Sequence, residues 1–440
     1  MSKTNNLLLK GTLLLTLAGL LSRIMGFFYK IFLAGFIGAE GMGIYQLIFP
    51  VYSVCFSLCA SGIETAISKL TAAKCATGNS GQAIGILKTG LLLSLTLSLG
   101  CSFVIFRFSS FLSLYFLKEP RCGQLLRILA VTIPFGTMQS CICGYYLGVH
   151  KAFVPSIAQL VEQTFRIGCV FLLQHIYLTN KMEISPAIAV IGLVFGEICS
   201  FLFTITCLSY QPSRLSKEHA NIAAYLPEIF SLAAPLTTSR ILINLLVSLE
   251  AVTIPYALKA YGMEHSQALS IYGILNGMVL PLILFPNALT GSVSLMLLPT
   301  VSESQAMGNL EELKHTVKTT FSFCLLLGGL CTLFFLLFGD LLGSVVFSST
   351  LAGSFITTLS WLCPFLYLNT TLNSVLNGLG KTSVTFFNGI VGLFIRIVFL
   401  WFFVPQFGIK GHLIGLLLSQ LFVTFSGCTF LHKYFLESIS

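Results

Sequence analysis

The chain has 440 residues, of which 55% are hydrophobic and 9% are charged, and its formal net charge at pH 7 is +9. Soluble globular proteins carry about 25% charged residues, so this chain needs lipid as part of its solvent. This apolar composition excludes a cytosolic enzyme, a nucleic-acid-binding protein and a secreted disulfide scaffold. The net positive charge does not indicate nucleic-acid binding either, because the basic residues are scattered singly along the sequence.

Apolar runs long enough to cross a membrane follow one another along the whole chain. A spanning helix needs about 20 apolar residues, and twelve such runs are predicted. They cover residues 11–37, 43–68, 83–106, 123–149, 152–177, 185–210, 227–252, 268–298, 316–338, 352–378, 384–404 and 409–432. The longest polar stretches are 211–226 and 299–315. The pattern predicts an all-α integral membrane protein of about 12 transmembrane helices.

The basic residues between these runs predict the orientation of the chain. Of the 24 basic residues, 12 fall on the side of the N-terminus, six on the opposite side and six within the spans. Basic loops face the cytoplasm. The chain is therefore predicted to be a multi-pass protein with both termini cytoplasmic.

The two halves of the sequence repeat each other. A shift of 230 residues aligns five positions of the first half with five of the second: Lys88 with Lys318, Pro134 with Pro364, Gly148 with Gly378, Lys151 with Lys381, and Arg166 with Arg396. Six spans in each half make a parallel repeat, with a six-helix N-terminal lobe at residues 1–215 and a six-helix C-terminal lobe at 216–440. Transporters built in this way bind substrate between the halves near the middle of the membrane and alternate access by rocking.

Four arginines lie near the middle of the predicted bilayer. A rise of about 1.5 Å per residue places Arg23, Arg166, Arg240 and Arg396 about 18–21 Å from the inner ends of their spans. A charge at the bilayer centre costs about 2.5–3.5 kcal/mol, so these side chains are expected to face counter-ions or a hydrated cavity. Lys30 lies one heptad after Arg23 on the same helical face.

Acidic partners for these arginines are few. Glu162 precedes Arg166 by four residues, the favourable order for a pair on one helix, whereas the span of Arg23 has no acidic residue. Four acids are candidates for ion coupling or for counter-ions: Glu64, Glu162, Glu197 and Glu250. Pairing between helices stays open as the alternative role of the arginines. The excess of cations suits an anionic substrate, since arginine matches the geometry of phosphate oxygens.

The sequence carries no motif for enzyme chemistry. The stretch Gly380-Lys381-Thr382 lacks the earlier glycine of a phosphate-binding loop, because Val375 stands in its place. The 14 cysteines lie mostly in apolar runs and form no C-x-x-C pair, which is typical of small buried hydrophobic residues. The chain is predicted not to be an enzyme and to use no cofactor, metal ion, nucleotide or nucleic acid.

Three segments near the N-terminus resemble a known family. They are SRIMGFFYK at residues 22–30, GAEGMGIYQ at 38–46 with Pro50 after it, and SGIETAISK at 61–69. The sequence is similar there to the stage V sporulation protein B family. That family belongs with polysaccharide exporters and lipid II flippases in the multidrug/oligosaccharidyl-lipid/polysaccharide exporter superfamily. The resemblance implies the MATE-like transporter fold.

The same resemblance implies that the chain flips an undecaprenyl-pyrophosphate-linked oligosaccharide, a cell-wall or polysaccharide precursor, to the outer leaflet of the bacterial plasma membrane. Relatives use cationic residues of the first span at the central cavity, which here are Arg23 and Lys30. The expected partners are this lipid-linked anionic sugar and membrane lipids, and a monomer is expected. Lipid II flippases usually have fourteen spans, and about twelve are predicted here.

Two other functions are consistent with the pattern. A cation-coupled exporter of the multidrug and toxin extrusion type shares the twelve-span repeat, and would need membrane-embedded carboxylates such as Glu197 and Glu250. A structural role in spore or envelope assembly would need no cationic cavity.

Overall fold

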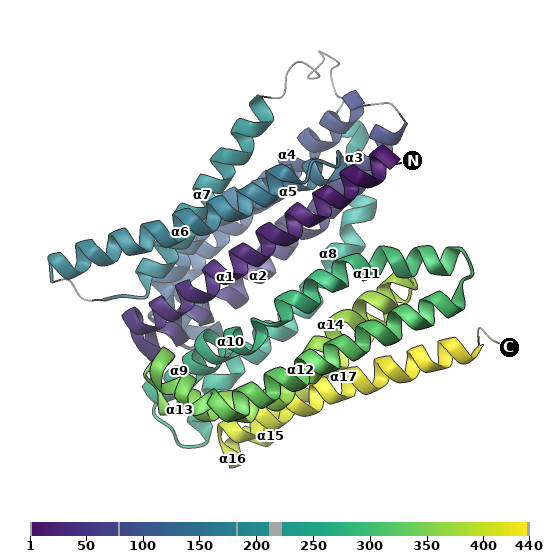
Figure 1. Cartoon of the computed structure of the whole chain (residues 1–440). Helices are drawn as coiled ribbons and strands as arrows, with labels where there is room; N and C mark the ends of the chain where they lie inside the picture. The colour runs from purple at the N-terminus through teal and green to yellow at the C-terminus, as the bar shows by residue number, and fades with distance from the viewer. Residues whose placement is uncertain (1, 78–79, 182–183, 211–221, 438–440) are drawn as a thin grey trace. The chain divides into compact units, whose positions relative to one another are not determined.

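The computed structural model describes residues 2–77, 80–181, 184–210 and 222–437, and within these ranges every regular element is a helix (Figure 1). A helix satisfies its own backbone hydrogen bonds, which a chain in hydrocarbon must do. In these ranges 11 helical stretches are long and apolar enough to cross a membrane. The prediction of an all-helical membrane protein is confirmed.

The first of these stretches, Leu13–Ala76, has 64 residues and holds both of the first two predicted spans. A backbone kink at Gly38, with φ 71° and ψ 178°, separates them. A side chain is strongly disfavoured in this conformation, so glycine is the residue that allows the chain to bend there. Each of the other stretches overlaps one predicted span, and the prediction of about twelve spans therefore agrees with the structure.

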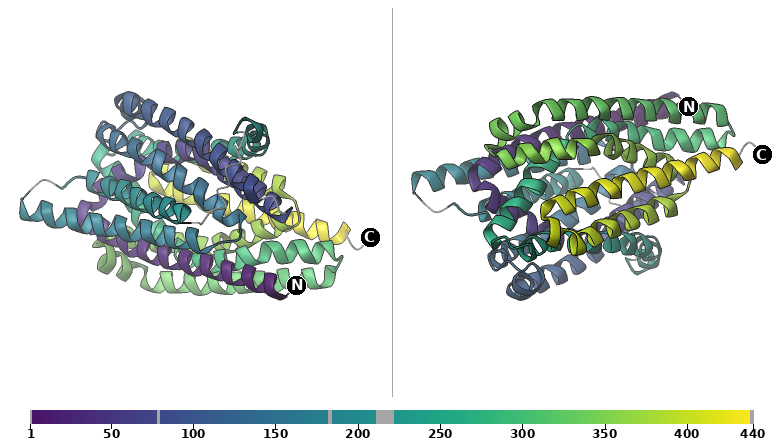
Figure 2. Two further views of the ribbon diagram at one scale, coloured as in Figure 1. Left: turned by 90° about the horizontal axis from the view of Figure 1, so that it is seen from above. Right: turned by 90° about the horizontal axis from the view of Figure 1, so that it is seen from below.

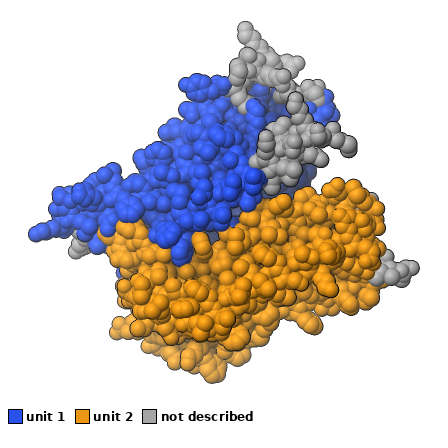
Figure 3. Space-filling view, in the orientation of Figure 1, with its two compact units in different colours: residues 1–29, 44–248 blue, residues 30–43, 249–440 orange. Residues whose placement is uncertain are grey.

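The chain forms two compact units, coloured separately in Figure 3. Unit 1 joins Met1–Tyr29 with Ile44–Ser248. Its helices, with the two that continue into the other unit, are α1 (Ser2–Leu47), α2 (Phe49–Phe56), the π-helical turn η1 (Ser57–Ser61), α3 (Gly62–Ala76), α4 (Ser80–Phe111), the π-helical turn η2 (Leu112–Phe116), α5 (Cys122–Gly148), α6 (Phe153–Thr179), α7 (Ala187–Ser209) and α8 (Ile222–Ala260).

Unit 2 joins Lys30–Gly43 with Leu249–Ser440. Beyond the segments of α1 and α8, its elements are α9 (His265–Tyr272), the π-helical η3 (Gly273–Val279), α10 (Leu280–Leu284), α11 (Asn287–Ala306), α12 (Leu310–Phe347), α13 (Thr350–Leu359), the 3₁₀ turn η4 (Ser360–Leu362), α14 (Cys363–Gly378), α15 (Thr382–Phe402), α16 (Val404–Phe407) and α17 (Ile409–Glu437). The predicted lobes, residues 1–215 and 216–440, stay a prediction, because the compact units group residues by contact and not by repeat.

The repeat-related helices pack in corresponding pairs. Helix α6 lies along α7 in unit 1, and α15 lies along α17 in unit 2 (Figures 1 and 2). Each unit also has its own buried apolar core, around Tyr146 in unit 1 and around Leu376 in unit 2. Each of these two helix pairs carries part of one of the charged clusters described below.

Two details differ from the sequence-based expectation. The predicted span 268–298 is interrupted at Phe285–Pro286, between α10 and α11. Proline lacks the N–H that would continue the helix, so the helix is expected to break there. The polar stretch 299–315 is mostly helical, since α11 continues to Ala306 and α12 begins at Leu310.

Candidate functional site

The first charged cluster lies in unit 1 and is called here the Arg166 cluster: Tyr52, Glu162, Arg166 and Glu197. The Arg166 guanidinium donates to the Glu162 carboxylate one helical turn earlier on α6, as the sequence predicts. Glu197 on α7 is 7% exposed, and its Oε1 accepts a hydrogen bond of 3.1 Å from the Tyr52 hydroxyl. The structure thus brings two of the predicted acids beside one arginine.

Glycines explain how α7 approaches this cluster so closely. A Cβ added to Gly196 would lie 2.6 Å from the Glu162 carbonyl oxygen and 3.0 Å from the Arg166 Cβ. A Cβ added to Gly136 on α5 would lie 3.0 Å from Oε2 of Glu197. The neighbouring helices therefore already occupy the space that a side chain at either position would need.

Some buried polar atoms around Arg166 have no hydrogen-bond partner in the part of the chain that the structure describes. They are the Tyr29 hydroxyl, Oε1 of Gln163 and Nε of Arg166. Tyr29 is only 5% exposed, and it interacts electrostatically with Arg166, as Tyr45 does. Unsatisfied buried polar atoms are costly, so this region can accept further polar contacts.

Glu64 and Arg240 form a second polar region in unit 1. The Ser140 hydroxyl donates to Oε2 of Glu64 at 2.5 Å, and Nη1 of Arg240 donates to the Ser61 carbonyl oxygen at 2.8 Å. Arg240 also interacts electrostatically with Glu64. The predicted midspan Arg240 therefore contacts the end of the π-helical turn η1, where backbone carbonyls are available as acceptors.

Arg23 differs from the other three arginines. Arg23 is exposed on α1. Its side chain forms no ion pair or hydrogen bond with any residue that the structure describes. Lys30, one heptad later, is half-buried and belongs to unit 2. The exposed Arg23 guanidinium is thus available to a ligand.

The second charged cluster lies in unit 2 and is called here the Glu250 cluster: Glu250, Arg396 and His412. Nη1 of Arg396 lies 3.2 Å from Oε1 of Glu250, and Nε2 of His412 lies 4.0 Å from the same oxygen. Glu250 and His412 are 6% and 2% exposed. Arg396 therefore has its counter-ion on another helix, the alternative left open by the sequence.

Sequence reasoning missed Tyr52 and His412, which complete the two clusters. Both residues stand alone in apolar segments, and neither shares a helix with its carboxylate partner. The distances to Glu197 and Glu250 depend on helix packing, so spacing along the sequence gave no signal for either contact.

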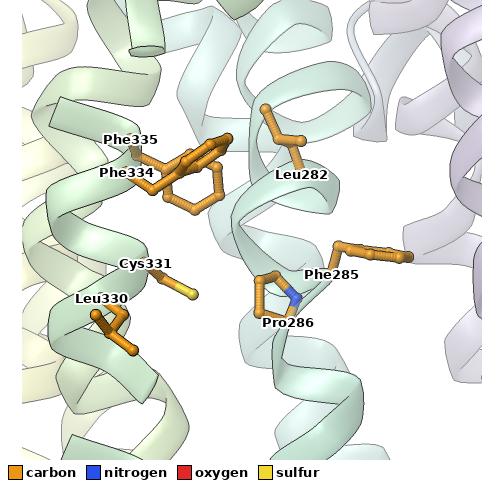
Figure 4. Close-up of a pocket in the computed structure, with 7 residues that line it drawn as sticks. All are labelled: Leu282, Phe285, Pro286, Leu330, Cys331, Phe334 and Phe335. Atoms are coloured by element: carbon orange, nitrogen blue, oxygen red, sulfur yellow. The ribbon is translucent and has the colours of Figure 1, made fainter. Parts of the chain in front are cut away.

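An apolar cavity of about 430 Å³ opens in unit 2 between α10 and α12 (Figure 4). Its lining residues are Leu282, Phe285, Pro286, Leu330, Cys331, Phe334 and Phe335. The cavity lies at the helix break beside Pro286, and no charged residue lines it. It can accept hydrocarbon but offers nothing to an anionic group.

Comparison with known proteins assigns the family. A family model described as "Polysaccharide biosynthesis protein" matches residues 8–305, and the MatE model matches residues 240–402. The chain belongs to the polysaccharide biosynthesis protein family. The predicted resemblance is thereby confirmed.

Relatives in Bacillus subtilis (strain 168) agree with this family. Stage V sporulation protein B is 28% identical over 423 residues, which cover 94% of this chain and 82% of that protein. Lipid II flippase MurJ is 24% identical over 341 residues, which cover 71% of this chain and 61% of the flippase.

Solved structures share the fold. Lipid II flippase MurJ in an inward closed conformation has a TM-score of 0.74 at 15% identity. The match covers 97% of this chain and 90% of the flippase chain. An inward-facing multidrug resistance MATE family transporter of the MOP superfamily has a TM-score of 0.73 at 16% identity, covering 94% and 95%. The predicted MATE-like fold is confirmed, and this member of the polysaccharide biosynthesis protein family is a multi-pass membrane protein with the fold of these two solved structures.

Proposed function

We propose that the chain moves an undecaprenyl-pyrophosphate-linked oligosaccharide from the inner to the outer leaflet of a bacterial plasma membrane by alternating access. The observation that carries this proposal is Arg23, an exposed arginine in the middle of a membrane-spanning helix without any acidic residue in its span. The name of the lipid II flippase relative supports the same class of cargo. In this proposal both termini are cytoplasmic and the working unit is a monomer.

The physical argument begins with the cost of Arg23. An arginine at the bilayer centre costs about 2.5–3.5 kcal/mol on insertion scales, so an exposed one is best explained by water or an anion beside it. A pyrophosphate offers several oxygens to the planar guanidinium fork. An inside-negative potential then favours outward movement of the anion by about 2.3 kcal/mol per charge for each 100 mV.

The other basic residues take different parts in the same proposal. Lys30 and Arg240 supply additional positive charge to the headgroup. Arg166 and Arg396 are already paired with Glu162 and Glu250, so they bind phosphate only by exchanging a carboxylate for it. Arg23 is therefore the first contact of the headgroup.

The test is a flipping assay in proteoliposomes with a fluorescent undecaprenyl-pyrophosphate oligosaccharide. Losing one charge-assisted contact costs about 1.5–3 kcal/mol, so Arg23→Gln should slow flipping by about 10- to 100-fold. Arg23→Lys keeps the charge and should retain more activity than Arg23→Gln. Arg107→Ala is the matched control, because Arg107 is exposed near the end of α4 and its guanidinium lies over the Phe108 ring.

Equal flipping by wild type and folded Arg23→Gln would remove Arg23 from the headgroup site. A wild-type protein that flips none of several lipid-linked sugars, yet exports cationic drugs and loses that export in Glu250→Gln, would instead be a cation-coupled drug exporter.

A further inference from the structure

The Arg166 cluster contains more carboxylates than cations. Glu162 forms an ion pair with Arg166, and Glu197 interacts electrostatically with both of them. Two ionised carboxylates beside one guanidinium leave a net charge of about −1 inside a membrane-spanning unit. Such an uncompensated buried charge is expensive, so the cluster should hold an additional positive charge.

The groups that face Glu197 show where that charge can be held. Helix α6 contributes Glu162 and Arg166, α2 contributes Tyr52, and α5 contributes the Cys143 thiol. Oε1 of Glu197 already accepts from Tyr52. Oε2 packs against Gly136, where an added Cβ would lie 3.0 Å from it, and no donor among the described residues is paired with it.

We infer that Glu197 is a proton-binding site, with the proton carried on Oε2 while Tyr52 continues to donate to Oε1. Proton binding converts the carboxylate to a neutral acid and brings the cluster to zero net charge. The inference deepens the proposed function by naming the coupling ion, and its transport half rests on that proposal.

A proton suits the site better than a metal cation. Sodium or calcium ions need several oxygen ligands around them, and the described residues contain no group of three or more His, Cys, Asp or Glu side chains placed to hold a metal. A proton needs a single lone pair. Two interacting carboxylates that cannot both ionise at low cost are a recurrent way of binding one.

The Glu250 cluster shows the contrast within the same molecule. There one carboxylate faces one arginine at 3.2 Å, so its charges balance without a proton. His412 is the other titratable group of that cluster. A neutral His412 adds no charge, so the net charge of the cluster stays at zero. Proton binding is therefore assigned to unit 1.

A first experiment needs no substrate. Infrared difference spectra of the protein in nanodiscs, recorded between acidic and basic pH, should show the carbonyl band of a buried protonated carboxylic acid. Glu197→Gln preserves the size of the side chain and an acceptor for Tyr52, and it should remove that band. Glu228→Gln is the control, since Glu228 is exposed and pairs with Lys74 at 3.8 Å; it should keep the band.

A second experiment measures coupling. With the membrane potential clamped at zero, an imposed pH gradient should accelerate flipping by the wild type and by Glu228→Gln, and should have no effect on Glu197→Gln. An unchanged infrared band in folded Glu197→Gln overturns the proton site whatever the cargo. Loss of the band in Glu197→Gln, together with a wild type that flips no lipid-linked sugar, supports the proton site and rejects the proposed cargo.

Discussion

Removing one partner of the ion pair between Glu250 and Arg396 should destabilise the protein far more than removing both. Arg396→Met leaves the Glu250 carboxylate buried, with His412 at 4.0 Å from it and no other ion-pair partner among the described residues. Breaking a buried pair costs about 3–5 kcal/mol. The Arg396 side chain is 21% exposed and that of Glu250 8%. Because the pair is partly hydrated, we expect a loss of stability at the lower end of this range, about 3 kcal/mol. The double variant Glu250→Gln/Arg396→Met buries no charge and should lie within about 1 kcal/mol of wild type.

The measurement is the free energy of unfolding in mixed detergent micelles, obtained by denaturant titration of wild type, both single variants and the double variant. The double-mutant cycle should give a coupling energy of at least about 2 kcal/mol. The pair Lys433–Glu437 is the control, because both side chains are more than two thirds exposed, and its cycle should stay within about 0.5 kcal/mol. A double variant as unstable as the worse single variant would refute the reasoning, because the loss would then come from packing.

The same double variant separates the two roles open to Arg396. If Arg396 only neutralises Glu250, the folded double variant should flip substrate at nearly the wild-type rate. If Arg396 also binds the pyrophosphate, the double variant should be stable and slow. Comparing stability with flipping rate therefore decides between them.

Two further perturbations test the packing of each unit. Gly62→Ala should destabilise unit 1 by about 1–3 kcal/mol, because its Cβ would lie 2.0 Å from Oγ1 of Thr237 and 2.6 Å from the Ala233 carbonyl oxygen; denaturant titration should find Gly100→Ala, which has open space, unchanged. Asn369→Leu should cost unit 2 about 1–2 kcal/mol by the same measurement, because the Asn369 side chain donates to Oε1 of Gln420 and accepts from Thr424, each at 2.8 Å. A stable Asn369→Leu would mean that the two partners find other hydrogen bonds.

The sequence predicted features that depend on neighbouring residues. Apolar run length located the spans, and the spacing of four residues identified the pair Glu162–Arg166, because contacts along one helix follow its period. The kink at Gly38 coincides with the short gap between the first two predicted spans. The break at Pro286 was missed because apolar residues continue on both sides of it.

Contacts between helices that are distant along the chain could not be predicted from the sequence. The pairing of Arg396 with Glu250 depends on how α15 packs in unit 2, and the same holds for the Tyr52 hydroxyl bond to Glu197. A single sequence lists which charges must be buried, but the partner of each charge is decided by helix packing. The assignment of Arg166 and Arg396 to substrate binding stays a prediction for this reason.

The repeat makes the difference between the two clusters informative. Arg166 and Arg396 occupy equivalent positions, but the equivalent of Glu162 is Gly392, so unit 2 lacks the acid one turn before its arginine. Its counter-ion Glu250 comes from α8 instead, and the residue of α17 equivalent to Glu197 is Gln420, which carries no charge. The arginine is thus common to both halves while the number of acids around it differs. Since charge balance decides whether a proton is needed, one ancestral position now serves two purposes: a balanced pair in unit 2 and, in our proposal, a proton-binding cluster in unit 1.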